Sequence, residues 1–141
     1  MKDSKKVDKY QRIVVLVILI VIAIPAIILS TVDFSPHKLI IQDNTVKIGI
    51  KSFQVEDIKN VELLENIEIY GRKKGTGTLT YTRGICKVEG ESQDATVYIY
   101  KNKSPYIKVE LENGLLIYND KNSNDTEKTY GKLVEITNMN E

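Results

Sequence analysis

The chain of 141 residues contains a single cysteine, Cys86, and a single histidine, His37. One cysteine excludes an intramolecular disulfide bond, and one Cys with one His cannot supply the ligands of a structural zinc site. A Cys–His nucleophilic pair would have to use these two residues, and no third, orienting group stands near either of them in the sequence. We therefore expect Cys86 to be a small strand residue and His37 a polar residue beside the membrane segment described below.

Net charge is also nearly absent, because 20 Lys and Arg stand against 19 Asp and Glu. A domain that binds nucleic acid over its whole surface is usually strongly basic, so we expect no nucleic-acid partner. The sequence has neither the Walker A spacing nor the GxGxxG fingerprint that bind phosphate groups. The absence of a Cys/His cluster and of these phosphate-binding motifs favours a protein that is not an enzyme and that uses no cofactor and no metal.

One long apolar run is present. Residues 13–29 read IVVLVILIVIAIPAIIL, seventeen residues without a charge. As a helix, this run with the three residues after it spans roughly 26–30 Å, close to the hydrocarbon thickness of a bilayer. The sequence therefore predicts a transmembrane helix over 13–32. A cleaved signal peptide is the alternative, but its apolar core is usually shorter and it ends in a small-x-small cleavage site, so we favour an uncleaved signal-anchor.

The flanks of this run predict its orientation. Residues 1–12 carry five bases against two acids, whereas the first residues after the run carry one lysine, Lys38. Because positive flanks stay on the cytoplasmic side, 1–12 is predicted to be a basic cytoplasmic tail, 33–37 a linker and 38–141 an extracytoplasmic domain. We expect a single-pass protein of the cell membrane, and the composition, rich in Ile, Lys and Asn, suggests a bacterial source.

Beyond residue 38 the apolar residues recur with a period of two, which predicts seven or eight short strands. Leu39–Ile41 and Val46–Ile50 are expected to form a hairpin around Asp43-Asn44. Ile107–Leu111 and the run after Gly114 are expected to form another, with Asn113-Gly114 as a type I′ turn in which both residues have positive φ. Strands in sequence with turns every eight to twelve residues indicate a mainly β domain, an antiparallel sandwich or barrel.

The last segment differs. The sequence NSNDTEKTYGKLVEI offers Ser123, Asn124 or Asp125 as an N-cap. Tyr130, Leu133 and Val134 then fall at the spacing i, i+3, i+4, which predicts one apolar stripe on a helix that lies on the sheet.

Several segments resemble the bacterial pleckstrin-homology (PH)-like domains, which occur in small membrane-anchored proteins, mainly of Gram-positive bacteria. They are the corner DIxxVxL (from Asp57), the stretch GRxxG (Gly71, Arg72, Gly75), the hairpin SPYIKVEL…NG and the IYND before the last helix. The resemblance covers about residues 38–137. It implies an antiparallel barrel or sandwich of about seven strands, closed by one C-terminal helix.

The resemblance implies little chemistry. Eukaryotic PH domains bind phosphoinositides through a basic loop between their first two strands, and here that position reads QDNT, without Lys or Arg. We therefore expect an interaction or scaffolding domain without catalysis. Its partners would be the lipid bilayer, through residues 13–32, and an unidentified protein.

The segment 70–84, YGRKKGTGTLTYTRG, remains the most site-like part of the chain, with four glycines and no acid. Glycine-rich backbone with cationic side chains can bind anions, whereas a solvated connection between strands needs no ligand. As an alternative function, a basic loop over 72–87 would bind an anionic membrane or cell-wall surface. A second alternative is an accessory subunit of a membrane complex. The candidate contact residues are Arg72, Lys73, Lys74, Arg83 and Lys87.

Overall fold

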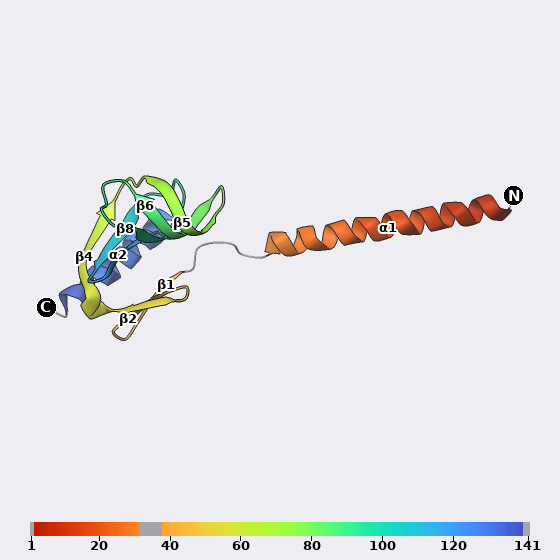
Figure 1. The fold of residues 1–141 in the computed structure, drawn as a ribbon. Helices are drawn as coiled ribbons and strands as arrows, with labels where there is room; N and C mark the ends of the chain where they lie inside the picture. Colours follow the sequence, from red (N-terminus) through yellow and green to blue (C-terminus); the bar gives the residue numbers. More distant parts are fainter. Residues whose placement is uncertain (1, 32–37, 140–141) are drawn as a thin grey trace. The chain divides into compact units, whose positions relative to one another are not determined.

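The computed structural model describes residues 2–31 and 38–139, which form parts of two separate units, 1–34 and 35–141 (Figure 1). The first unit is the helix α1 (Lys2–Thr31), which runs through Pro25. Within it, Asp8–Ile27 is long and apolar enough to cross a membrane, a property that signal sequences share. The helix thus begins well before the predicted boundary at residue 13 and includes the basic tail. The predicted linker 33–37, with His37, lies outside the described residues.

The second unit begins with a three-stranded antiparallel sheet made of β1 (Leu39–Gln42), β2 (Thr45–Ile48) and β3 (Lys51–Gln54). Asp43 turns the chain between β1 and β2 with a φ of 53°, so the predicted hairpin is confirmed. Leu39 pairs with Ile48 in this hairpin. The start of β1 and the β2–β3 turn therefore lie at the same end of the sheet.

A short 3₁₀ helix, η1 (Val55–Asp57), leads into a second sheet. This sheet has six strands in the order β4-β8-β9-β7-β6-β5. Its members are β4 (Ile58–Leu64), β5 (Ile69–Gly77), β6 (Tyr81–Val88), β7 (Ala95–Tyr100), β8 (Tyr106–Leu111) and β9 (Gly114–Tyr118).

The prediction of a mainly β domain is confirmed, with three differences. The described residues form nine strands, more than the seven or eight predicted. The six-stranded sheet ends in β4 on one side and β5 on the other and does not close into a barrel. In addition, β7 and β9 pair in parallel, whereas the other neighbouring strands are antiparallel. The parallel pair arises because β8 lies between β4 and β9 instead of beside β7.

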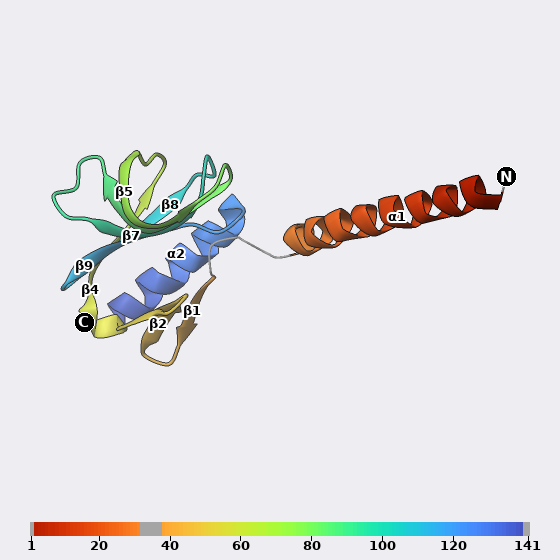
Figure 2. The same cartoon turned by 45° about the vertical axis from the view of Figure 1, so that its right-hand side comes forward.

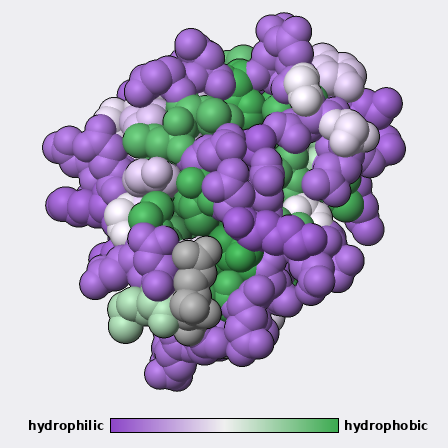
Figure 3. All heavy atoms as spheres, turned by 90° about the vertical axis from the view of Figure 1, so that its left-hand side faces the viewer, coloured by the Kyte–Doolittle hydropathy of each residue, from purple (hydrophilic) through white to green (hydrophobic). Residues whose placement is uncertain are grey.

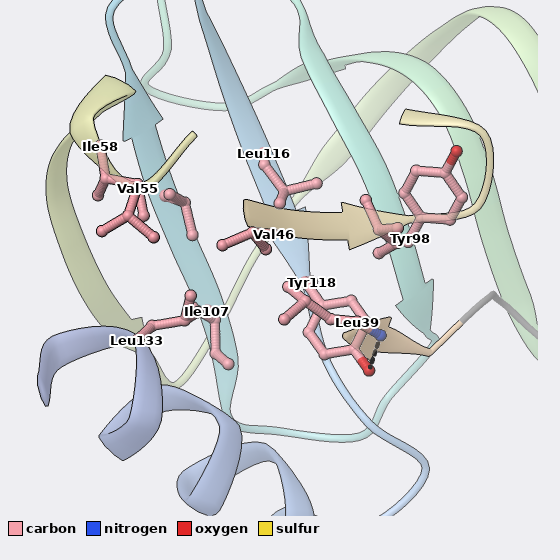
Figure 4. Packing of buried hydrophobic residues seen from close by; sticks show 11 residues of the cluster. Leu39, Val46, Val55, Ile58, Tyr98, Ile107, Leu116, Tyr118 and Leu133 are labelled. Carbon is pink, nitrogen blue, oxygen red and sulfur yellow. Dashed lines mark hydrogen bonds between the residues drawn. The ribbon is translucent and has the colours of Figure 1, made fainter. Parts of the chain in front are cut away.

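The six-stranded sheet buries residues on both faces, and successive side chains of a strand alternate between the two faces. On one face, here called the helix face, Tyr98, Leu116 and Tyr118 pack against Val46 of the three-stranded sheet and Leu133 of α2 (Ser123–Asn138), as Figure 4 shows. On the opposite face, a second cluster contains Cys86, Val97, Ile99 and Ile117, among others. Figure 2 shows α2, β1 and β2 on the same side of the larger sheet.

The predicted C-terminal helix is confirmed, but its N-cap lies one residue before Ser123, the first of the proposed caps. The Asn122 side chain accepts a hydrogen bond from the Asp125 N–H at 2.9 Å and is the N-cap. Of the predicted stripe, Leu133 is fully buried, and Tyr130 packs against the core from a partly buried position.

The β8–β9 hairpin is also confirmed, but its predicted turn is wrong. Leu111 pairs with Gly114, so Glu112 and Asn113 form the turn, one residue earlier than expected. Neither Asn113 nor Gly114 has a positive φ. The Asn-Gly pair therefore does not form the type I′ turn.

A buried polar network holds the residues between β9 and α2. The Tyr118 hydroxyl donates to Asp120 Oδ1 at 2.8 Å and accepts from the Leu39 N–H at 3.1 Å. The Thr129 hydroxyl donates to Asp120 Oδ2 at 2.8 Å. Burial raises the pKa of Tyr118, which keeps its hydroxyl available as this donor. The network ties the start of β1 to the start of α2.

Candidate functional site

The five candidate basic residues lie on strands and not in a loop, so the expectation of a basic loop over 72–87 is wrong. Most of segment 70–84 belongs to the hairpin β5–β6, whose turn is Thr78-Leu79-Thr80. The Thr78 hydroxyl oxygen accepts from the backbone N–H groups of Thr80 and Tyr81, both at 3.2 Å. The segment is thus a structured hairpin.

Two of its glycines allow the strands to approach each other closely. Gly75 and Gly84 are paired across β5 and β6 and have φ values of 117° and 137°. A Cβ on Gly75 would stand 2.2 Å from the Arg83 carbonyl oxygen, and one on Gly84 would stand 2.0 Å from that of Lys74. The glycines are therefore explained by strand geometry, without a phosphate ligand.

The hairpin separates the five candidate residues. Arg72 pairs with Cys86, and its side chain lies on the face of the sheet opposite the helix face. Lys73 forms an ion pair with Asp94 at 2.6 Å. Lys87 is exposed and lies across from Gly71. Only Lys74 and Arg83 line the same groove.

That groove, here called the cationic groove, has a volume of about 390 Å³ and lies on the helix face, between the β2–β3 turn with β3 and the strands β5, β6 and β7. Ile85 and Tyr98 contribute apolar surface to it. Figure 4 shows the Tyr98 ring beside the chain that follows β2. The groove is lined by Ile50, Lys51, Lys74, Gly75, Arg83, Gly84, Ile85, Thr96 and Tyr98.

Lys51 is the functional candidate that the sequence did not reveal. It begins β3, and its Nζ donates to the Thr96 hydroxyl oxygen on β7 at 2.9 Å. This bond holds a third cation beside Lys74 and Arg83. None of the residues that line the groove, all of them in the described part of the chain, is acidic.

A second pocket, of about 470 Å³, lies on the opposite face. Arg72 and Lys101 contribute cations to it, Glu68 contributes an acid, and Ile99 and Tyr106 contribute apolar surface. Lys101 Nζ donates to the Thr78 carbonyl oxygen at 2.5 Å. Because this pocket mixes both signs of charge, the cationic groove is the more selective site for an anion.

Cys86 and the Asp and Glu side chains are potential metal ligands among the described residues. Cys86 is fully buried, and its burial raises the thiol pKa although the nearby Arg72 lowers it. Among residues 2–31 and 38–139, no group of three His, Cys, Asp or Glu side chains is arranged to hold a metal ion.

On the face drawn in Figure 3, hydrophilic side chains cover most of the surface and apolar atoms show only between them. No family model matches this chain, and no curated protein or solved structure matches it either. The proposals below therefore rest on the geometry of the domain.

Proposed function

We propose that this chain is a single-pass membrane protein whose β domain is a non-catalytic binding module for an anionic ligand with an apolar part. The observation that carries the proposal is the cationic groove. Lys51, Lys74 and Arg83 line it together with apolar side chains, and none of its lining residues is a carboxylate. Cations on three separate strands match the oxygens of a phosphate or carboxylate group, and such charge-assisted hydrogen bonds are the stronger kind.

The membrane anchor in this proposal is α1. Its segment Asp8–Ile27 has the length and composition of a span, and the bases before it favour an N-terminus in the cytoplasm. The β domain would then lie on the outer side of the cell membrane. The resemblance to bacterial PH-like domains remains a prediction, and the parallel β7–β9 pair departs from the antiparallel layout that it implies.

A binding role fits the lining of the groove better than a catalytic one. Lys51 has a fixed partner in Thr96, and the apolar floor consists of Ile85 and Tyr98. No His, Cys, Asp or Glu side chain lines the groove, whose residues all lie in the described part of the chain, and the Lys51 ammonium donates to the Thr96 hydroxyl. The groove offers positive charge beside apolar surface, which would select a ligand with an anionic group and an apolar part.

This proposal is tested by adding a short amphiphilic anion to the full chain in zwitterionic nanodiscs. Hexyl phosphate is expected to shift the methyl NMR signals of Ile50 and Ile85 saturably, while the core residue Ile107 stays unchanged. Hexanol, which lacks the charge, is expected to shift them far less. In the double variant Lys74→Gln/Arg83→Gln the affinity is expected to fall about tenfold, equivalent to about 1.4 kcal/mol.

Lys87→Gln is the matched control, because Lys87 is an exposed cation of the same hairpin that does not line the groove. It is expected to bind hexyl phosphate like the unchanged chain. Equal shifts with hexanol, or equal losses in the control and the double variant, would contradict a charge-selective groove.

A further inference from the structure

We propose that the anion recognised by the cationic groove is the headgroup layer of the membrane that α1 spans, with the turn residues Ile50 and Leu79 entering the lipid interface. This inference rests on the proposed function, since it names the source of the anionic groups. Three features carry it: two turns with exposed aliphatic side chains, the position of the β2–β3 turn beside the start of β1, and the cations close to both turns.

The two turns expose aliphatic side chains almost completely. Ile50, in the β2–β3 turn, is 99% exposed, and Leu79, in the β5–β6 turn, is 96% exposed. Single exposed aliphatic residues are common on soluble proteins. These two are unusual because each forms the end of a projecting turn and lies near cations, as side chains that enter a membrane interface do.

The β2–β3 turn lies beside the start of β1, the first strand that follows α1 in the chain. Leu39, the first residue of β1, pairs with Ile48, which directly precedes the turn carrying Ile50. The six residues 32–37 separate α1 from the described part of the β domain, and even fully extended they keep Lys38 within about 25 Å of the end of α1. Figure 1 shows the β2–β3 and β5–β6 turns at the same end of the β domain.

The charge behind the turns suits an anionic lipid surface. Lys51 follows Ile50 directly, and Lys74 and Arg83 lie on the strands that lead to and from Leu79. Lys101, whose Nζ binds the Thr78 carbonyl oxygen, adds a fourth cation at the base of that turn. A short tether also raises the effective concentration of the surface to the millimolar range, so weak individual contacts are enough for docking.

The absence of tryptophan from the chain makes the test direct. Ile50→Trp and Leu79→Trp each introduce a single tryptophan at a turn. Met139→Trp serves as the control, because Met139 is also an exposed apolar residue but follows α2 at the other end of the β domain. The full-length variants are placed in nanodiscs of zwitterionic lipid alone or with phosphatidylglycerol, and brominated acyl chains serve as the quencher.

With phosphatidylglycerol, tryptophan at positions 50 and 79 is expected to show a blue-shifted emission and quenching by brominated lipid. Tryptophan at position 139 is expected to show neither. High salt, or the added changes Lys51→Gln, Lys74→Gln and Arg83→Gln, is expected to abolish the blue shift. Emission at positions 50 and 79 that matches position 139, or that is the same in both lipid mixtures, would overturn the inference.

The two proposals can fail separately. If hexyl phosphate binds in the groove but the turn tryptophans remain in water, the groove recognises a soluble anion or an acidic protein segment and the lipid assignment is wrong. If the turns enter the lipid while hexyl phosphate does not bind, the surface contact stands without a defined groove ligand.

Discussion

Replacing Asn119 by alanine is expected to lower the free energy of unfolding of the β domain by about 3 kcal/mol. Asn119 is fully buried, and its side chain accepts from the Tyr100 N–H at 2.6 Å. It also donates to the carbonyl oxygens of Tyr100, at 3.0 Å, and Lys103, at 2.6 Å. Alanine would leave all three backbone groups without these partners, and each unsatisfied buried group costs about 1–3 kcal/mol.

The measurement is urea unfolding of the full chain in detergent micelles, followed by tyrosine fluorescence. Asn60→Ala is the matched control, because Asn60 is exposed and its amide donates to the Glu62 side chain at the surface. It is expected to change the free energy of unfolding by less than about 0.5 kcal/mol. Similar changes in the free energy of unfolding for the two variants would contradict this prediction. They would mean that the hydrogen bonds from Asn119 to Tyr100 and Lys103 do not stabilise the β domain.

Replacing Gly84 by alanine is expected to destabilise the β domain by about 3 kcal/mol and to disrupt the β5–β6 hairpin. The φ of 137° is essentially restricted to glycine, and forcing another residue into such a region costs on the order of 1–3 kcal/mol. The added Cβ would also stand 2.0 Å from the Lys74 carbonyl oxygen, so the strands must separate. Amide hydrogen exchange of residues 70–88 is expected to accelerate in this variant.

Gly131→Ala is the matched control, since Gly131 lies in α2 and a Cβ there meets nothing within 4 Å. Because alanine favours a helix over glycine, this change is expected to stabilise the domain by about 1 kcal/mol. Unchanged amide hydrogen exchange and an unchanged free energy of unfolding in Gly84→Ala would contradict the close approach of β5 and β6 at Gly84.

Local pattern was sufficient to predict most of the strands and the last helix, but it missed β5, most of which lies in the segment expected to be a loop. Period-two alternation placed Val97 and Ile99 on one face and Tyr98 on the other, and the structure confirms this arrangement. The cap of α2 was misplaced by one residue because Asn122, Ser123, Asn124 and Asp125 are all capable caps. In the structure Asn122 takes the cap position, and the Asp120 N–H just before it donates to the Thr126 hydroxyl oxygen in the first turn of α2.

The candidate site was predictable only in part. Lys74 and Arg83 were identified from composition, but the glycines beside them were interpreted as flexibility. Their real cause is the approach of two strands, which composition does not show. Lys51 was missed because its partner, Thr96, is 45 residues away along the chain and meets it only when the two sheets pack.

The proposed function requires that α1 anchors the chain in the membrane with the β domain outside, and thiol labelling of intact cells tests this directly. Cys86 is fully buried and its thiol pKa is raised by burial, so it provides a silent background. A new cysteine at the exposed turn residue Glu112, Glu112→Cys, would then report the side of the membrane. We predict that a membrane-impermeant maleimide labels this variant in intact cells and that the labelled chain stays in membranes washed with alkaline carbonate. Labelling only after lysis, or release of the chain by carbonate, would contradict the account.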